Sequence, residues 1–184
     1  MHFNQKTLGP KDMQPLCGFD ASMLKEWRRL DLLEGIGKLE SNGRWKYSVR
    51  EAVMLAICNS LRLANLPGYV AIKVAKDIHD DVLKTADFYG SNVEPDFKLL
   101  AIWNNEASGQ NPQFQGFSQY PPWETYAADD FEEIYRFIQA PAPIVVDLHK
   151  IAKAFPDALM AAMLTAMEEL RRWRLARKPM PRIP

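Results

Sequence analysis

The chain has 184 residues, of which 47% are hydrophobic and 25% charged, and its formal net charge is zero. This length allows one substantial core or two small ones, and the composition is that of a folded globular protein. No apolar run approaches the roughly 20 residues that a membrane-spanning helix needs, and residues 1–10 lack a secretory signal pattern. Its two cysteines, Cys17 and Cys58, are far apart in the sequence and typical of reduced core thiols, so we expect a cytoplasmic protein.

The zero net charge hides an uneven distribution along the chain. Residues 1–76 carry twelve Lys and Arg against seven Asp and Glu, whereas residues 77–147 carry three against thirteen. Residues 148–184 are basic again, with eight against three. The basic head, residues 1–76, favours a polyanionic partner such as nucleic acid. The acidic middle, residues 77–147, is a different electrostatic surface.

The sequence opens with a predicted short helix and a tight turn. The helix covers Pro10–Leu16, because proline suits a first helical turn. The turn covers Cys17–Phe19, where Gly18 can take a positive φ. Asp20 or Ser22 can then cap a second helix.

The second helix is predicted to be amphipathic. Its apolar stripe consists of Met23, Leu24, Trp27 and Leu30. Three basic residues, Lys25, Arg28 and Arg29, are expected to project from its other side.

A hairpin and two further helices complete the head. Asn42-Gly43 is a strong hairpin-turn signal, because both residues tolerate a positive φ. Ser48 and Glu51 form a capping box that begins a long apolar helix. Leu66-Pro67-Gly68 ends this helix, and another is expected over Tyr69–Leu83.

The rest of the chain predicts a small mixed region and a long helix. Strands are expected over Phe97–Trp103 and Ile144–Leu148, with a long exposed loop or a loose hairpin over residues 104–122. A helix is expected over Ala128–Gln139, and a longer one over Ile151–Arg177, which Pro156 can interrupt.

The order of helix, turn, helix, hairpin and long helix resembles the MerR family of DNA-binding regulators. Leu24–Leu33 is similar to the family's "LRYWE..GLL" stretch, and Asn42–Ser48 is similar to its "NGYR.YS" stretch. The resemblance covers about residues 10–83. It departs at Lys25, where the family has Arg, and at Asp31, where it has Gly. The family's Tyr-Arg falls on Arg44-Trp45.

The predicted elements and the resemblance together imply a mainly α protein with a small β content, divided at residue 83. Residues 1–83 would be a winged helix-turn-helix, and residues 84–184 a small α+β region with a long C-terminal helix. The second helix would enter the major groove of duplex DNA, and the hairpin would be a wing that contacts phosphates. The residues expected to bind DNA are Ser22, Lys25, Arg28, Arg29, Arg44, Lys46 and Tyr47.

Some of these residues have other interpretations. Arg28 and Lys25 are the candidates for contacts with base edges, but arginines on this helix can also form a solvated face. Tyr47 can be a strut between the hairpin and a helix rather than a phosphate contact.

The long C-terminal helix is a candidate dimer interface, because family members commonly dimerise through such a helix. Its apolar stripe includes Met160, Met163, Met167, Leu170 and Trp173. The same stripe could equally pack in the core of one molecule.

The function expected from these patterns is sequence-specific DNA binding by a homodimeric bacterial or phage regulator. One alternative is a phage excisionase-like or packaging protein that binds DNA as architecture. Another is an adaptor whose acidic middle binds a basic protein. We expect no enzymatic activity, metal or cofactor, since His79-Asp80-Asp81 is typical of a charged surface and His149 has no visible catalytic partner.

Overall fold

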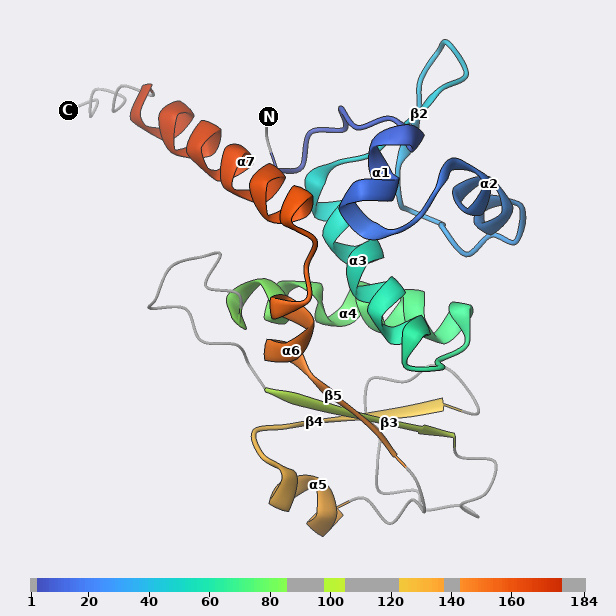
Figure 1. The fold of residues 1–184 in the computed structure, drawn as a ribbon, viewed down its shortest axis with the longest axis vertical. Coiled ribbons are helices and arrows are strands. Elements are labelled where there is room, and N and C mark those ends of the chain that lie inside the picture. Colours follow the sequence, from blue (N-terminus) through green and yellow to red (C-terminus); the bar gives the residue numbers. More distant parts are fainter. Residues whose placement is uncertain (1–2, 86–97, 105–122, 138–142, 177–184) are drawn as a thin grey trace, which may run out of the picture. The chain divides into compact units, whose positions relative to one another are not determined.

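The computed structural model describes residues 3–85, 98–104, 123–137 and 143–176 (Figure 1). These residues form a mainly helical fold with two small antiparallel sheets. The chain divides into two compact units. The first unit consists of Met1–Lys76 and Phe155–Pro184, and the second consists of Asp77–Ala154. The C-terminal helix therefore belongs with the head, whereas the sequence grouped it with the region after residue 83.

The first unit begins with two short helices joined by a tight turn. Helix α1 covers Pro10–Cys17, and its first turn is closed by the backbone N–H of Gly9, which donates to Asp12 Oδ2 at 2.6 Å. Gly18 ends α1 with a φ of 79°, a left-handed conformation that favours glycine. Helix α2 covers Ala21–Arg29, and Asp20 caps it by accepting from the N–H of Met23.

A two-stranded hairpin follows α2. Strand β1 covers Lys38–Leu39 and pairs with β2, Trp45–Lys46. Of the Asn42-Gly43 pair, only Gly43 has a positive φ, 75°. Its N–H donates to Glu40 O at 2.9 Å, so the loop is a three-residue turn with a bulge. The hairpin predicted at Asn42-Gly43 is therefore confirmed.

Two longer helices follow the hairpin. Helix α3 covers Val49–Leu63 and begins at the predicted capping box of Ser48 and Glu51. It ends before Asn65, which takes a φ of 67°. Helix α4 covers Gly68–Thr85, close to its predicted bounds.

Helix α7, Asp157–Ala176, completes the first unit by packing against α1 and α3 (Figure 1). The fully buried side chains of this unit come from α1, α2, α3, their connections, the first part of α4 and α7. They include Met13, Phe19, Leu24, Leu33, Tyr47, Leu55, Ile57, Leu61 and Met163.

The second unit contains a three-stranded antiparallel sheet in the order β4-β3-β5. Strand β3 covers Leu99–Asn104, β4 covers Trp123–Ala128 and β5 covers Ile144–Asp147. Helix α5, Phe131–Phe137, follows β4, and α6, Leu148–Lys153, follows β5. A small core contains Leu99, Ala101, Ala128 and Ile134.

This unit agrees with the sequence in part. Two predicted strands and the helix after residue 128 are present with adjusted ends, whereas β4 was not predicted. The chain is not helical from Ala154 to Pro156, so the long helix expected from Ile151 is two helices, α6 and α7. Nearly all of the predicted loop over residues 104–122 lies outside the described residues.

Candidate nucleic-acid interface

Helix α2 has one buried face and one exposed face. Leu24 and Trp27 are buried, and the Trp27 ring meets the edge of Phe19 with centroids 4.9 Å apart. The residues on the opposite side are exposed, namely Ser22, Lys25, Glu26 and Arg29. Three of the predicted DNA-binding residues therefore lie together on a solvent-facing surface.

The exposed face of α2 carries two ordered polar pairs. The Ser22 hydroxyl donates to Asp20 Oδ1 at 2.7 Å, so this serine supports the capping residue of its own helix. The Arg29 guanidinium donates to both carboxylate oxygens of Glu26 at 2.9 and 2.6 Å. Those hydrogen bonds lower the pKa of Glu26 and raise that of Arg29. Glu26, which the sequence did not single out, therefore holds the guanidinium of Arg29 in a defined orientation.

Arg28 does not share this exposed face. Its Nη2 donates to Ile36 O at 2.7 Å and to the Tyr47 hydroxyl at 3.1 Å. Its guanidinium carbon lies 3.3 Å from the centre of a Trp45 ring, which is a cation–π contact. The charged end of Arg28 is therefore engaged with the hairpin rather than left free on the exposed face of α2, and its contact with base edges stays a prediction.

Two predicted residues of the hairpin are also turned inward. Tyr47 is 1% exposed, and its backbone pairs with Leu8. This burial favours the alternative interpretation of Tyr47, a strut between the hairpin and a helix, over a phosphate contact. Lys46 is half-buried, and its ammonium group donates to Thr7 O at 3.2 Å.

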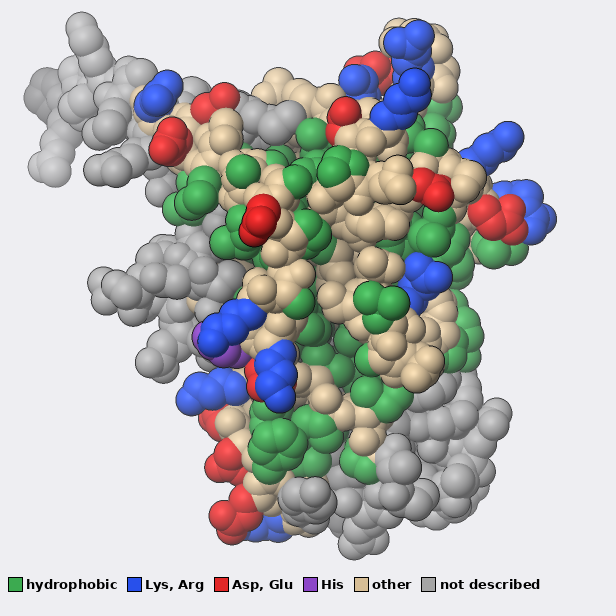
Figure 2. All heavy atoms as spheres, in the orientation of Figure 1, with side chains coloured by type: hydrophobic (Ala, Val, Ile, Leu, Met, Phe, Trp, Pro, Cys, Tyr) green, Lys and Arg blue, Asp and Glu red, His purple; other side chains and the backbone are tan. Residues whose placement is uncertain are grey.

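Arg44 lies in the turn of the hairpin and is exposed. Its backbone N–H donates to Asn42 Oδ1 at 2.9 Å, which orders the turn beneath the side chain. Lys38, opposite Lys46 in the strand register, is also exposed and was not predicted as a site residue. Figure 2 shows Lys and Arg side chains over the hairpin and over α2 on the face that it presents.

Glu51 fixes the base of the hairpin to α3. This side chain is 6% exposed. Its Oε2 accepts from the backbone N–H of Ser48 at 2.7 Å, and its Oε1 accepts from the N–H of Gly37 at 2.7 Å. The ammonium group of Lys6 lies 2.9 Å from the same Oε1 and also donates to Gly37 O. The capping box predicted from the sequence is therefore also a link between helix and hairpin.

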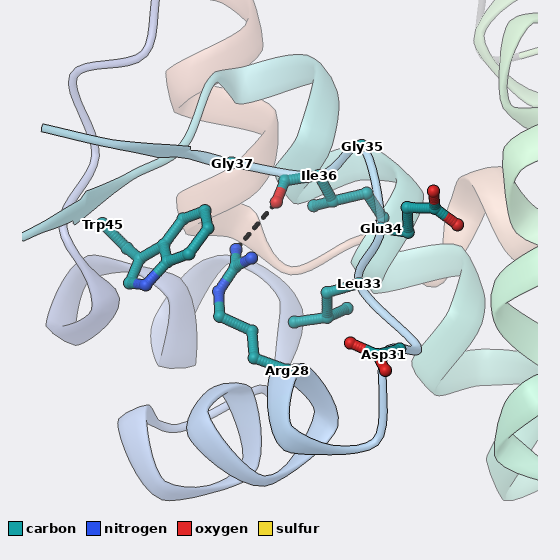
Figure 3. Close-up of a pocket in the computed structure, with 8 residues that line it drawn as sticks. All are labelled: Arg28, Asp31, Leu33, Glu34, Gly35, Ile36, Gly37 and Trp45. Atoms are coloured by element: carbon teal, nitrogen blue, oxygen red, sulfur yellow. Dashed lines mark hydrogen bonds between the residues drawn. The ribbon is translucent and has the colours of Figure 1, made fainter.

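A cavity of about 540 Å³ lies where the end of α2 meets the hairpin (Figure 3). The loop between them turns sharply, with positive φ values at Asp31, Gly35 and Gly37. The cavity is lined by Arg28, Asp31, Leu33, Glu34, Gly35, Ile36, Gly37 and Trp45. In Figure 3 the side chain of Glu34 points away from the other seven residues. The cavity is thus a gap between two elements that Arg28 bridges.

The predicted dimerisation residues are divided between core and surface. Met163 is completely buried within one molecule, so it is a core residue of α7. Met160 is half-buried and Met167 is 36% exposed. The neighbouring Leu164, which was not predicted, is 58% exposed. The side chains of Leu170 and Trp173 lie outside the described residues.

Other candidate groups give no further site. His79 and Asp81 are each 7% exposed, so the prediction of a charged surface is wrong for these two residues, whereas the side chain of Asp80 between them is 45% exposed. Cys17 and Cys58 are free and buried, and burial raises the pKa of both thiols to about 12. Within the described ranges, no three His, Cys, Asp or Glu residues are grouped as metal ligands. No helix in those ranges is both long and apolar enough to cross a membrane.

The chain matches no model of a known protein family and no curated protein. The features of the molecule that bear on its function are the geometry and the charge of the first unit.

The two units carry opposite charges. The first unit contains 18 Lys and Arg against 10 Asp and Glu, a formal charge of +8. The second contains 5 against 13, a formal charge of −8. The predicted division at residue 83 would leave formal charges of only +2 and −2, so the division into units separates the charges more completely than that boundary does. The exposed face of α2 and the hairpin both belong to the basic unit.

Proposed function

We propose that the first unit is a winged helix-turn-helix that binds duplex DNA in a sequence-specific transcriptional regulator. Helix α2 would be the recognition helix in the major groove, and the hairpin would be the wing. The observation that carries this proposal is the formal charge of +8 on a unit that exposes Lys25, Arg29 and Arg44 on two adjacent elements. Clustered positive charge of this kind attracts the phosphate backbone.

The local backbone is compatible with the resemblance that motivates the proposal. Asp31 stands where the MerR pattern has glycine, and it takes a φ of 55°. Aspartate is among the residues that tolerate this left-handed conformation best after glycine, so the departure from the pattern preserves the turn. Trp45 stands where the pattern has Arg, and it packs against the guanidinium of Arg28.

The structure changes the roles proposed for individual residues. Lys25 and Arg29 would face the groove, with Lys25 the remaining candidate for a base-edge contact. Arg44 and Lys38 would contact phosphates from the wing. Tyr47 would support the wing from within, because it is buried.

The test is DNA binding by the full chain at several salt concentrations, after selection of a preferred site from random duplexes. Arg44→Ala should weaken binding to all sequences and reduce the log–log salt slope by roughly 0.9, the value for one neutralised phosphate. Lys25→Ala should relax the preference at one or two base pairs, with a loss of discrimination of about 1–3 kcal/mol.

Lys153→Ala is the matched control, because Lys153 is an exposed lysine of the second unit. It removes the same charge from the chain and should leave both the slope and the preferred sequence unchanged. Absence of duplex binding by the wild type at low salt would overturn the proposal.

A further inference from the structure

The hairpin is linked to two helices through different atoms of the same short segment. Toward α3, Glu51 accepts from the N–H of Gly37. Toward α2, Arg28 donates to the carbonyl of Ile36, one residue earlier. The position of the hairpin relative to α2 therefore depends on Arg28, whereas its attachment to α3 does not.

The guanidinium of Arg28 fits closely among its neighbours. It covers the Trp45 ring at 3.3 Å and lies 5.4 Å from the centre of the Tyr47 ring. A Cβ atom at Gly37 would lie 2.5 Å from Arg28 Nη2, so only glycine leaves room for this contact. Gly37 also has a φ of 78°, which favours glycine independently.

The position of Arg28 between α2 and the hairpin has an unfavourable contribution to the free energy of folding, because one of its hydrogen-bond donors is left without a partner among the described residues. Arg28 Nε is buried and has no hydrogen-bond partner among the described residues. A buried donor without a partner is unfavourable, so the bonds of Nη2 and the contact with Trp45 must offset this cost. A planar guanidinium can stack on an aromatic ring and donate in its own plane at the same time, which a lysine ammonium group cannot.

We propose that Arg28 is a positioning residue that couples the hairpin to α2, so that both elements meet DNA as one preorganised surface. This inference rests on the proposed function, in which α2 and the hairpin both contact DNA. Arg28 itself does not contact DNA. It reduces the loss of conformational freedom on binding, because the hairpin is already held in place beside α2.

The first arm of the test needs no DNA. Arg28→Met retains the apolar stem and removes the donors and the charge. Amide hydrogen exchange should become faster in the hairpin, for example at the N–H of Glu40, which donates to Arg44 O. Exchange in the middle of α3 should stay unchanged, because Glu51 still holds that link. Arg28→Lys should give an intermediate increase, since it retains the positive charge beside Trp45.

The second arm measures DNA affinity in two backgrounds. In the wild type, Arg28→Met should weaken binding by about ten-fold, or about 1.4 kcal/mol, within the range of coupled contacts. In the Lys38→Ala/Arg44→Ala background the same substitution should have little effect, because the hairpin no longer contributes basic contacts for Arg28 to position.

The outcomes separate the inference from the proposed function. An equal loss in both backgrounds would show that Arg28 contacts DNA directly and would overturn the positioning role. Unchanged hairpin exchange in both Arg28→Met and Arg28→Lys would overturn it as well. If hairpin exchange accelerates but the wild type binds no duplex, the coupling of the hairpin to α2 through Arg28 is supported and the DNA-binding function is excluded. Circular dichroism of each variant detects global unfolding. If Arg28→Met does not fold, amide exchange of the hairpin in Arg28→Lys tests the positioning role.

Discussion

Neighbouring residues of α2 have opposite roles, and the helical period explains why. Arg28 lies four residues after Leu24 and next to Trp27, so it stands at the edge of the buried face. Arg29 lies four residues after Lys25 and shares its exposed face. The sequence therefore contained the signal that separates the two arginines, although both were predicted to face DNA. The same reasoning applies to Tyr47, two residues after Trp45 in an extended segment, where alternate side chains share a face.

Only one part of the contact set of Glu51 could be predicted from the sequence. Its capping bond to Ser48 is local and was predicted. The bonds from Gly37 and Lys6 come from residues 14 and 45 positions away, and they depend on how the hairpin and N-terminal segment fold back.

We predict that Glu51→Ala destabilises the protein, because it leaves the N–H of Gly37 and that of Ser48 without their acceptor. A buried polar group that loses its partner costs about 1–3 kcal/mol. The measurement is the midpoint of urea unfolding followed by circular dichroism. Glu34→Ala, at an exposed glutamate, should change stability by no more than about 0.5 kcal/mol. Similar shifts for both variants would contradict the bridging role of Glu51.

At the scale of elements, local signals placed the helices well and the strands less well. The Ser48–Glu51 capping box and Gly18 set helix ends through contacts within a few residues, and the structure confirms both. Strand β4 has the sequence WETYAA, which lacks the strong apolar alternation of a typical strand. It forms because it pairs with β3 along its whole length, a contact that no local pattern shows.

Helix α7 gives a prediction at this scale, because its buried and exposed apolar residues are adjacent. Met163 is 0% exposed, whereas Leu164 is 58% exposed. Met163→Ala should cost about 2–5 kcal/mol of unfolding free energy by leaving a cavity in the first unit. Leu164→Ala, measured at protein concentrations low enough to keep the chain monomeric, should cost no more than about 0.5 kcal/mol. Thermal and urea unfolding of the two variants measure the difference, and equal costs would mean that α7 does not pack on α1 and α3 as described.

At the scale of the whole molecule, the sequence predicted the charge pattern but not the way the chain divides. The alternation of basic, acidic and basic segments is visible in the order of residues. The C-terminal segment joins the N-terminal head through contacts between residues more than a hundred positions apart. The periodicity of apolar residues along the chain carries no information about such contacts. The result is a unit with a formal charge of +8 and another with −8. In the proposed complex, the acidic unit would be repelled by DNA, which favours contact through the basic unit alone.

The last prediction concerns assembly. A single recognition helix reads few base pairs, too few to select one site among roughly 10⁶ or more competitors, whereas a symmetric dimer reads two half-sites. Because Met163 is buried, the large apolar side chains of α7 that the structure describes and that a second copy could contact are Leu164, Met167 and half-buried Met160. We predict a dimer in solution that Leu164→Asp/Met167→Asp dissociates without unfolding, because each charge would be buried at the interface. Sedimentation equilibrium at micromolar concentrations measures the association, and circular dichroism checks the fold. Met163→Asp is the contrasting variant, and it should unfold the first unit rather than yield a folded monomer. A wild type that sediments as a monomer, or a double variant that remains dimeric, would exclude this face of α7 as the interface.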